Sequence, residues 1–523
     1  MTIETESETQ PNTVGWWPMA IIAAMVLLSD ITLYHTDGFF GPAVFFPLAA
    51  VLLVVGHRRV TMSLVGLLTG GLLLTLSVRL AWSGSAGQIL VSLWLLNAFA
   101  MTIHGMRPYL LETVMFLAST IPGGYEFLHS IQVGWRRVVL EPVDLGKSSR
   151  FLNIALPVIC VSLFGTFFVM ANPDLIKEVS SVLGDVFGRL QIWLMRYSFT
   201  EILFWGGVAW ITAGLLFPFA RWTFESAATA ETESDLPAED NRLFAPFRNT
   251  ILALIGLFSV YLVFEFRTLW FRRFPAGFHY SGYAHEGAAW LTAALALATV
   301  ILSLMFRGTM MCHSRLAQLK LLAWVWSGLN LLLAMSVYNR LLIYIDYNGM
   351  TRMRTVGLLG ISCVVTGFLL VLWKIVRRRS FHWLVQHQLQ VPVFAVCLYV
   401  AAPVDSLVHR FNVSSILAGH PEPSVQISEH PIEDAALPVL IPLLDCEDTI
   451  IRDGVQALLH LRLQQLRSSL SSASMPDWTA WQFGTDRAIS ELEAVERRVS
   501  GSPSNTESNA ARERFREYAM QWW

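Results

Sequence analysis

The residues of this sequence best suited to chemistry form a polar and aromatic stretch, residues 338–354, between two strongly apolar segments. On a helix, Arg340, Tyr344 and Tyr347 share one face through gaps of four and three residues. An arginine guanidinium on such a face could hold an anionic group, and tyrosine hydroxyls could set its orientation. The stretch is therefore a candidate binding site for an anion.

Other ionisable residues lie near the ends of apolar segments, where charges at membrane depth are costly and usually face a bundle interior or a cavity. Asp30 comes late in the first segment, and residues 280–287 precede a later one. We expect these residues to converge toward one face of the membrane. The candidate ligand-binding set is Asp30, Glu265, Arg267, Tyr283, His285, Glu286, Arg340, Tyr344, Asp346, Thr351 and Arg354.

A structural interpretation of the same residues stays open. Arginine and tyrosine at helix ends commonly reach the membrane interface and hold the helix there. Asp30 paired with an arginine could lock helix packing. His285 beside Glu286 could form a proton relay, whereas a histidine at the surface is the more common case.

The common catalytic and metal-binding signatures are missing from the sequence. The five cysteines lie far apart and form no C-x-x-C or cysteine/histidine spacing, so neither a zinc site nor a disulfide framework is indicated. No Walker loop, G-x-S-x-G or H-E-x-x-H motif is present. We expect no metal and no cofactor, and we favour a protein that is not an enzyme.

The elements that position these residues are predicted to be membrane helices. The chain is 54% hydrophobic and only 15% charged, and its net charge of −2 gives no sign of nucleic-acid binding. A spanning helix needs about 20 mostly apolar residues. Such segments lie near 16–35, 38–56, 61–80, 86–104, 151–171, 201–220, 249–271, 287–306, 319–345, 354–376 and 382–402.

The predicted fold is therefore an all-α polytopic membrane bundle of about eleven helices with a small helical C-terminal appendage. Lysines and arginines favour the loops that face inside when the N-terminus is cytoplasmic, most clearly at residues 377–379, which are all arginine. An odd number of helices then places the C-terminus outside. The ionisable residues of the candidate set gather toward this outer face.

The predicted organisation has six parts. One helix pair in the appendage resembles a single α-solenoid repeat, which cannot bury its own apolar face, so we expect it to dock on the membrane domain. The appendage is also the place where a protein partner could bind, and the lipid bilayer is the expected surrounding. The parts are a polar tail (1–14), an N-terminal membrane half (15–224), an acidic loop (225–247), a C-terminal membrane half (248–402), the soluble helical appendage (403–500), and a linker with a terminal amphipathic helix (501–523).

Several stretches, among them residues 28–38, 264–270, 283–287 and 340–354, carry recognisable patterns. In these stretches the chain resembles an uncharacterised bacterial family of polytopic membrane proteins, known as domains of unknown function 4173 and 4153. The family shows an R-x-x-x-Y pattern followed by Y-G-L-T-x-x-R, and this chain carries Arg340 to Tyr344 and then residues 347–354 with one inserted residue. The resemblance covers about residues 20–460 and implies a multi-pass protein of the bacterial cytoplasmic (inner) membrane, with no known chemistry. The matching stretches are 28–38, 171–173, 264–270, 283–287, 340–354 and 435–440.

Three functional hypotheses follow, from different classes. The first is binding or transport of a small or lipid-like ligand at an outer-facing polar pocket. The second is a membrane enzyme that acts on a lipid-linked or envelope substrate, with His285, Glu286 or Asp346 as acid or base. The third is a scaffold or signalling anchor whose appendage recruits a partner.

Overall fold

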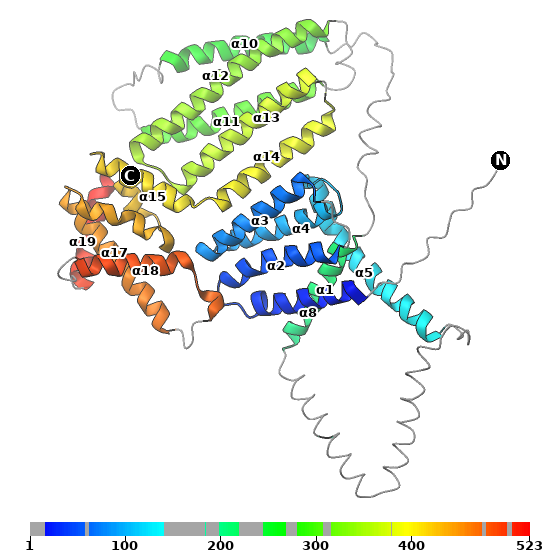
Figure 1. Cartoon of the computed structure of the whole chain (residues 1–523). Coiled ribbons are helices and arrows are strands. Elements are labelled where there is room, and N and C mark those ends of the chain that lie inside the picture. The colour runs from blue at the N-terminus through cyan, green and yellow to red at the C-terminus, as the bar shows by residue number, and fades with distance from the viewer. Residues whose placement is uncertain are drawn as a thin grey trace, which may run out of the picture. The chain divides into compact units, whose positions relative to one another are not determined.

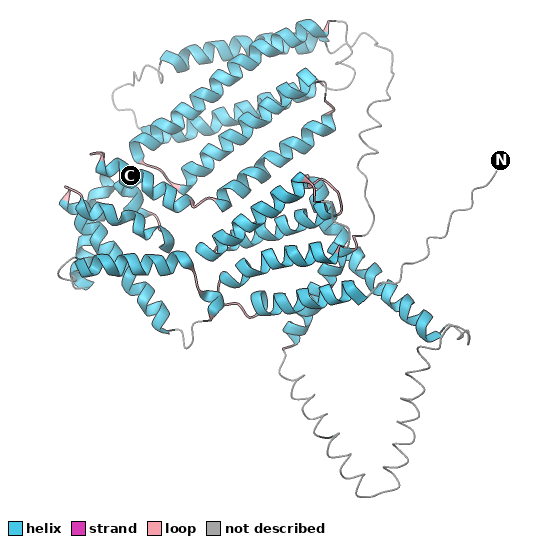
Figure 2. Ribbon diagram, in the orientation of Figure 1, coloured by secondary structure: helices cyan, strands magenta, loops and turns pink. Residues whose placement is uncertain are grey.

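The computed structural model describes residues 16–57, 62–140, 184, 198–218, 244–267, 280–306, 315–377, 379–472, 477–498 and 505–522. Within these residues the regular elements are all helices and no strand occurs (Figures 1 and 2), so the predicted all-α class is confirmed. The membrane-region helices are α1 (Trp16–Ser29) with its π-helical extension η1 (Asp30–Tyr34), α2 (Phe40–Gly56), α3 (Leu64–Trp82), α4 (Ala86–Ile103), α5 (Leu110–Leu140), α8 (Phe199–Leu216), α10 (Phe244–Glu265), α11 (Tyr280–Met305), α12 (Leu316–Asn348), α13 (Arg352–Arg377) and α14 (Phe381–Ala401).

Nine helices of the described chain are long and apolar enough to cross a membrane, namely α1 with η1, α3, α4, α8 and α10 to α14. Helix α2 is apolar but shorter. These ten correspond to ten of the eleven predicted segments, and the remaining one, residues 151–171, lies outside the described residues. The chain is therefore a multi-pass membrane protein built from a helical bundle.

The chain divides into two compact units. The first unit holds α1, η1, α8, and the C-terminal parts of α2 and α5. Within it α1 and η1 pack along α8, and the indole Nε1 of Trp17 donates to the backbone oxygen of Val55 (3.0 Å). The second unit holds the other described helices.

Helices α10 to α14 form the membrane part of the second unit. Helix α12 packs against α10, α11 and α13, and α13 also packs against α11 and α14. In Figure 1 helices α11 to α14 lie side by side. Their shared core contains the fully buried aromatic side chains of Phe306, Trp326 and Phe368, which bury more apolar area than any other residue type. Helix α14 also packs against α3 and α4.

The C-terminal appendage gathers at the end of this bundle where α12 turns into α13 (Figure 1). Its core contains Leu437, Leu440, Val455 and Phe515, each fully buried. The segment η4 winds as a 3-10 helix rather than an α-helix, and two prolines within it remove backbone donors. The appendage elements are α15 (Val404–Leu417), α16 (Ser424–Glu429), η4 (Asp434–Asp445), α17 (Thr449–Ser472), η5 (Trp478–Ala480), α18 (Phe483–Arg498), α19 (Asn505–Ala519) and η6 (Met520–Trp522).

Candidate functional site

The chain reverses between α12 and α13 at Gly349, whose φ is 81° and ψ is −178°. This backbone region is open almost only to glycine. A Cβ at this position would also lie 2.7 Å from both Asn412 Oδ1 and Pro423 Cβ. Two residues further on, the hydroxyl of Thr351 accepts a hydrogen bond from the backbone N–H of Arg354 (3.1 Å) and caps α13. The glycine thus lets the appendage approach the turn closely.

The appendage supplies hydrogen-bond partners for the backbone of this turn. The side-chain amide of Asn412 in α15 accepts from the N–H of Met350 (2.6 Å) and donates to its carbonyl oxygen (2.9 Å). The carbonyl oxygen of Asn348 accepts from Gln426 Nε2 (2.9 Å), and Asn348 Nδ2 donates to the carbonyl oxygen of Trp522 (3.3 Å). Buried backbone groups outside a helix need such partners, so the turn and the appendage stabilise each other.

An ion pair joins the first residue of α13 to the appendage. The guanidinium of Arg352 donates two hydrogen bonds to the carboxylate of Asp405, which also accepts from the backbone N–H of Glu433 (2.9 Å). Burial of Asp405 opposes its ionisation, but the Arg352 guanidinium and the Glu433 N–H outweigh burial and lower the pKa of Asp405. Burial, and then the charge of Asp405, raise the pKa of Glu433.

A cavity of about 1100 Å³ lies at this junction. Its walls come from α11, α12, the turn at residues 349–351, α13, α14, α15, α16, residues 430–431 and η6. Its lining mixes apolar side chains such as Leu341 and Ile361 with polar ones such as Tyr344 and Gln426. The volume lies just above the usual range of about 300–1,000 Å³ for small-molecule sites.

Arg354 is the most unusual side chain of the cavity wall. It is only 8% exposed, its guanidinium donates to the carbonyl oxygen of Gly349, and its Cζ atom lies 3.9 Å from the centroid of the Tyr344 ring. Among the described residues, no carboxylate lies within ion-pair distance of Arg354. A buried charge without a counter-charge is costly, so an anion in the cavity would stabilise this guanidinium.

Two further polar atoms of the cavity wall are buried and lack a hydrogen-bond partner among the described residues, His409 Nδ1 and Gln426 Oε1. Burial lowers the pKa of His409 to about 4, so the imidazole is neutral at neutral pH. The pKa of His430 is also lowered, first by burial and then by the charge of Arg354. The charges that remain on the wall are Arg352, Arg354 and Asp405, which leave a net charge of about +1.

A second buried cluster lies nearby along α12. Arg340 Nε donates to Glu265 Oε1 (2.7 Å) and Arg340 Nη2 donates to Glu265 Oε2 (2.5 Å). The two side chains are 2% and 0% exposed. The hydroxyls of Tyr261 (3.0 Å) and Ser336 also donate to the carboxylate. Both charged groups therefore find their counter-charge and hydrogen-bond partners within the protein. This agrees with the interpretation in which such residues hold helices together.

The structure distributes the predicted site residues over several places. Tyr344, Thr351 and Arg354 line the cavity, and Glu265 pairs with Arg340. Tyr283, His285 and Glu286 lie in the first turns of α11, and their side chains are outside the described part. Arg267 follows α10 and is exposed, as is Asp346. Asp30 belongs to the first unit, where Trp205 and His35 are its neighbours.

Two of the helix ends expected to converge, the start of α11 and the turn after α12, meet within the second unit. A Cβ at Gly287 of α11 would lie 2.2 Å from Arg340 Nη1, and Ala288 and Ala289 line the same cavity as Arg354. Residues 283–287 and 340–354 therefore lie at the same end of the bundle, and their role as ligand-binding residues stays a prediction.

Sequence reasoning missed the appendage residues that complete the cavity, namely Asp405, His409, Gln426 and Trp522. They lie on α15, α16 and η6, where a single histidine or glutamine gives no signal of its own. The one available signal was Asp405, an acidic residue four positions after the end of a membrane helix.

Comparison with protein families gives a match for this chain. The family described as Domain of unknown function (DUF4153) matches residues 48–443. Among curated proteins and solved structures nothing matches this chain. The matched range includes α3, α4, α10 to α14 and the appendage as far as Leu443 in η4. It therefore includes the lining of the cavity except for Trp522.

Proposed function

The chain belongs to the DUF4153 family of domains of unknown function, and on that premise we propose that it binds an amphiphilic anion in the cavity between its membrane helices and its C-terminal appendage. The ligand carries a phosphate or carboxylate group and an apolar part. The observation that carries this proposal is Arg354, a buried guanidinium on the cavity wall without a carboxylate partner among the described residues.

The polar lining supports a headgroup at this end of the cavity. Arg354 would donate to the anion, as guanidinium groups do to phosphate and carboxylate. His409 Nδ1 and Gln426 Oε1 are unpartnered among the described residues and buried, so a hydroxyl or amine of the same ligand could satisfy them. Such a ligand would leave fewer polar groups unpaired than the cavity has by itself.

The exposed side of the cavity indicates that the ligand has an apolar part. Ala289, Met353 and Gly360 line the cavity and are exposed, and all three lie on spanning helices. Met353 is 76% exposed, so this side of the cavity borders the apolar surface of α11 and α13. A lipid-like molecule could place its chain here and its headgroup beside Arg354.

The binding test uses purified full-length protein in nanodiscs of phosphatidylcholine, with and without phosphatidylglycerol, and native mass spectrometry. Wild-type protein should retain the anionic lipid. Arg354→Gln should weaken retention roughly tenfold to a hundredfold, the range for a charged hydrogen bond. Arg377→Gln, an exposed arginine at the other end of α13, should retain the lipid as wild type does.

Two competition experiments distinguish a free anion from an anionic lipid as the ligand. Inorganic phosphate should displace the bound lipid only if the headgroup alone supplies the affinity. Dihexanoyl phosphatidylglycerol should displace it if the acyl chains also contribute. Equal lipid retention by wild type and a folded Arg354→Gln protein would refute the proposal.

We place the cavity on the outer side of the bacterial cytoplasmic membrane. Helix α13 runs from the cavity to Lys374 and Arg377, and Arg377 is the first of three consecutive arginines at residues 377–379. Positive charge of this kind favours the cytoplasmic side. Since Trp522 lines the cavity, a C-terminal fusion reports its side: alkaline phosphatase should be active and green fluorescent protein dark. The reverse pattern would place the cavity inside.

A further inference from the structure

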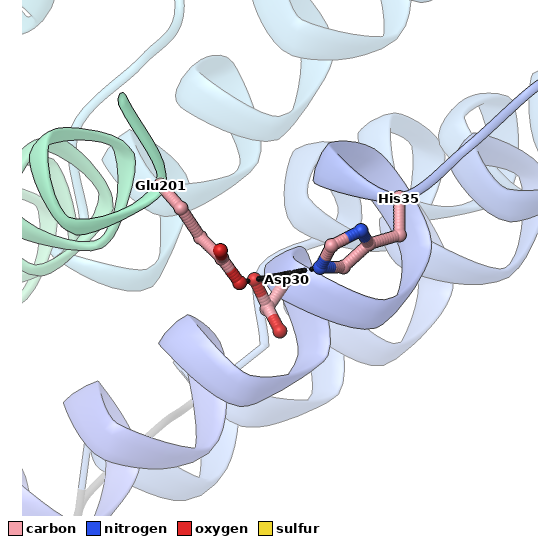
Figure 3. A group of neighbouring side chains, drawn as sticks. All are labelled: Asp30, His35 and Glu201. Carbon is pink, nitrogen blue, oxygen red and sulfur yellow. Dashed lines mark hydrogen bonds and ion pairs between the residues drawn. The ribbon is translucent and has the colours of Figure 1, made fainter. Parts of the chain in front are cut away.

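Three side chains with metal-ligand chemistry meet in the first unit, Asp30, His35 and Glu201 (Figure 3). One ligand atom from each residue lies within 4.8 Å of those of the other two. His35 Nε2 is 3.2 Å from Glu201 Oε1 and 3.9 Å from Asp30 Oδ1. The three residues come from η1, the residue after it, and α8.

The π-helical segment η1 is what brings Asp30 and His35 together. The backbone N–H of His35 donates to the carbonyl oxygen of Asp30 (3.2 Å), a bond across five residues. In an α-helix, residues five apart point about 140° away from each other. The wider π turn brings them closer to one face, and such turns are frequent at functional sites.

Neighbouring donors fix the two carboxylates. The backbone N–H of Ser198 donates to Glu201 Oε2 (3.3 Å), while Glu201 Oε1 faces His35. The indole Nε1 of Trp205, one turn along α8, donates to Asp30 Oδ1 (2.8 Å). Hydrogen bonds of this kind orient carboxylate ligands around bound metals.

We propose that Asp30, His35 and Glu201 form a binding site for a divalent transition-metal ion of the zinc type. Zinc takes imidazole nitrogen and carboxylate oxygen at about 2.0–2.2 Å, which in tetrahedral geometry separates two ligand atoms by roughly 3.4 Å. The distances of 3.2 and 3.9 Å lie on either side of that value. Small side-chain movements therefore suffice to bind the ion.

Charge favours a divalent ion over a simple histidine–carboxylate pair. Two carboxylates and one protonated histidine leave a net charge of about −1, and the Glu201 side chain is only 5% exposed. A divalent cation with a neutral imidazole gives a balanced site. It also removes the repulsion between the two carboxylates, which water screens only weakly at side chains that are 5% and 17% exposed.

The exposure of the three side chains leaves the site open on one side. Glu201 and Asp30 are 5% and 17% exposed, but His35 is 59% exposed. An ion can therefore enter beside the imidazole. Three protein ligands leave a fourth position for water or for an outside donor, as in catalytic zinc sites.

The test is metal binding by purified full-length protein that has been treated with a chelator. Titration with Zn²⁺ alone should give one tight site per chain, and Co²⁺ should give the strong visible absorption of tetrahedral coordination. His35→Ala and Glu201→Gln should each weaken Zn²⁺ binding at least tenfold. The glutamine keeps an acceptor for the Ser198 N–H, so α8 retains this contact.

Matched controls on α5 of the same unit are His129→Ala and Glu126→Gln, both at exposed positions. They should bind Zn²⁺ as wild type does. Asp30→Asn serves as a second ligand variant if one of the others unfolds, with the melting temperature of each protein measured without metal. Failure of the wild type to bind Zn²⁺ tightly, or wild-type affinity in folded His35→Ala and Asp30→Asn proteins, would overturn the proposal.

Discussion

Arg340 and Glu265 form a bidentate ion pair in which neither side chain is more than 2% exposed. The pair joins α12 to the last residue of α10. The carboxylate is further held by the hydroxyls of Tyr261 and Ser336. Such a pair stabilises one arrangement of two helices, since either charge alone would be buried without a partner.

We therefore expect Arg340→Met to destabilise the protein by about 3–5 kcal/mol, because it leaves the Glu265 carboxylate buried and unpaired. Glu265→Gln should be comparably harmful. The double variant should lose much less free energy of unfolding than the two single variants together, because no uncompensated charge remains. Thermal unfolding in detergent, analysed as a double-mutant cycle, measures the coupling. Additive losses would show that the two side chains do not act together.

Gly349→Ala should disturb the junction of the bundle and the appendage. An alanine is strained at a φ of 81°, and its Cβ would collide with Asn412 and Pro423. We expect a loss of about 1–3 kcal/mol. Gly367→Ala on α13 is the matched control, since a Cβ there meets nothing within 4 Å. It should be neutral or stabilise the helix by up to about 1 kcal/mol. Unfolding midpoints of both variants provide the comparison.

The membrane helices could be predicted from the sequence because the requirement behind them is simple. A segment must hide its backbone polar groups and expose about 20 apolar residues, and ten predicted segments match apolar helices of the structure. The length of α12, which runs from Leu316 to Asn348, exceeded the predicted segment 319–345 at both ends. Its last residue, Asn348, forms hydrogen bonds with Gln426 and Trp522 of the appendage, which hydropathy does not report.

The contacts of the sites could not be predicted in the same way. Arg352 pairs with Asp405 across 53 residues, and a single sequence contains no information on such partners. Asp30 and His35 are brought together by a π turn, whereas helical periodicity would have separated them. The polar turn at residues 338–354 was recognisable by composition, yet Arg340 and Arg354 have different surroundings: one meets Glu265, the other a cavity.

Stability should fall as the pH falls from about 6.5 to about 4, because of His409. This buried histidine has a folded-state pKa of about 4 against 6.5 in the unfolded chain, so in that window the unfolded chain binds more protons. The neutral His409 contributes roughly 3 kcal/mol to the free energy of unfolding above pH 6.5, and this contribution is lost below pH 4. Asp405, Arg352 and His430 are the charged or titratable groups acting on it.

The measurement is the unfolding temperature of wild type and His409→Gln between pH 4 and pH 8. The variant should show a flatter profile over the window. Protonation of Asp405 should lower the stability further only at lower pH, because its folded-state pKa lies below the ordinary value of 3.8. His420→Gln replaces an exposed histidine that follows α15, and its profile should follow wild type. A His409→Gln profile as steep as that of wild type would contradict the assignment.

Phe515→Ala should loosen the terminal helix and the cavity together. Phe515 is fully buried in the appendage core, and its truncation should cost about 3–5 kcal/mol. Helix α19 continues into η6, whose Trp522 lines the cavity, so the variant should also release bound anionic lipid faster. Limited proteolysis of the C-terminus and lipid retention in nanodiscs measure the two effects. Arg514→Ala, at an exposed neighbouring position, should change neither. Faster proteolysis with unchanged lipid retention would show that Trp522 does not help to close the cavity.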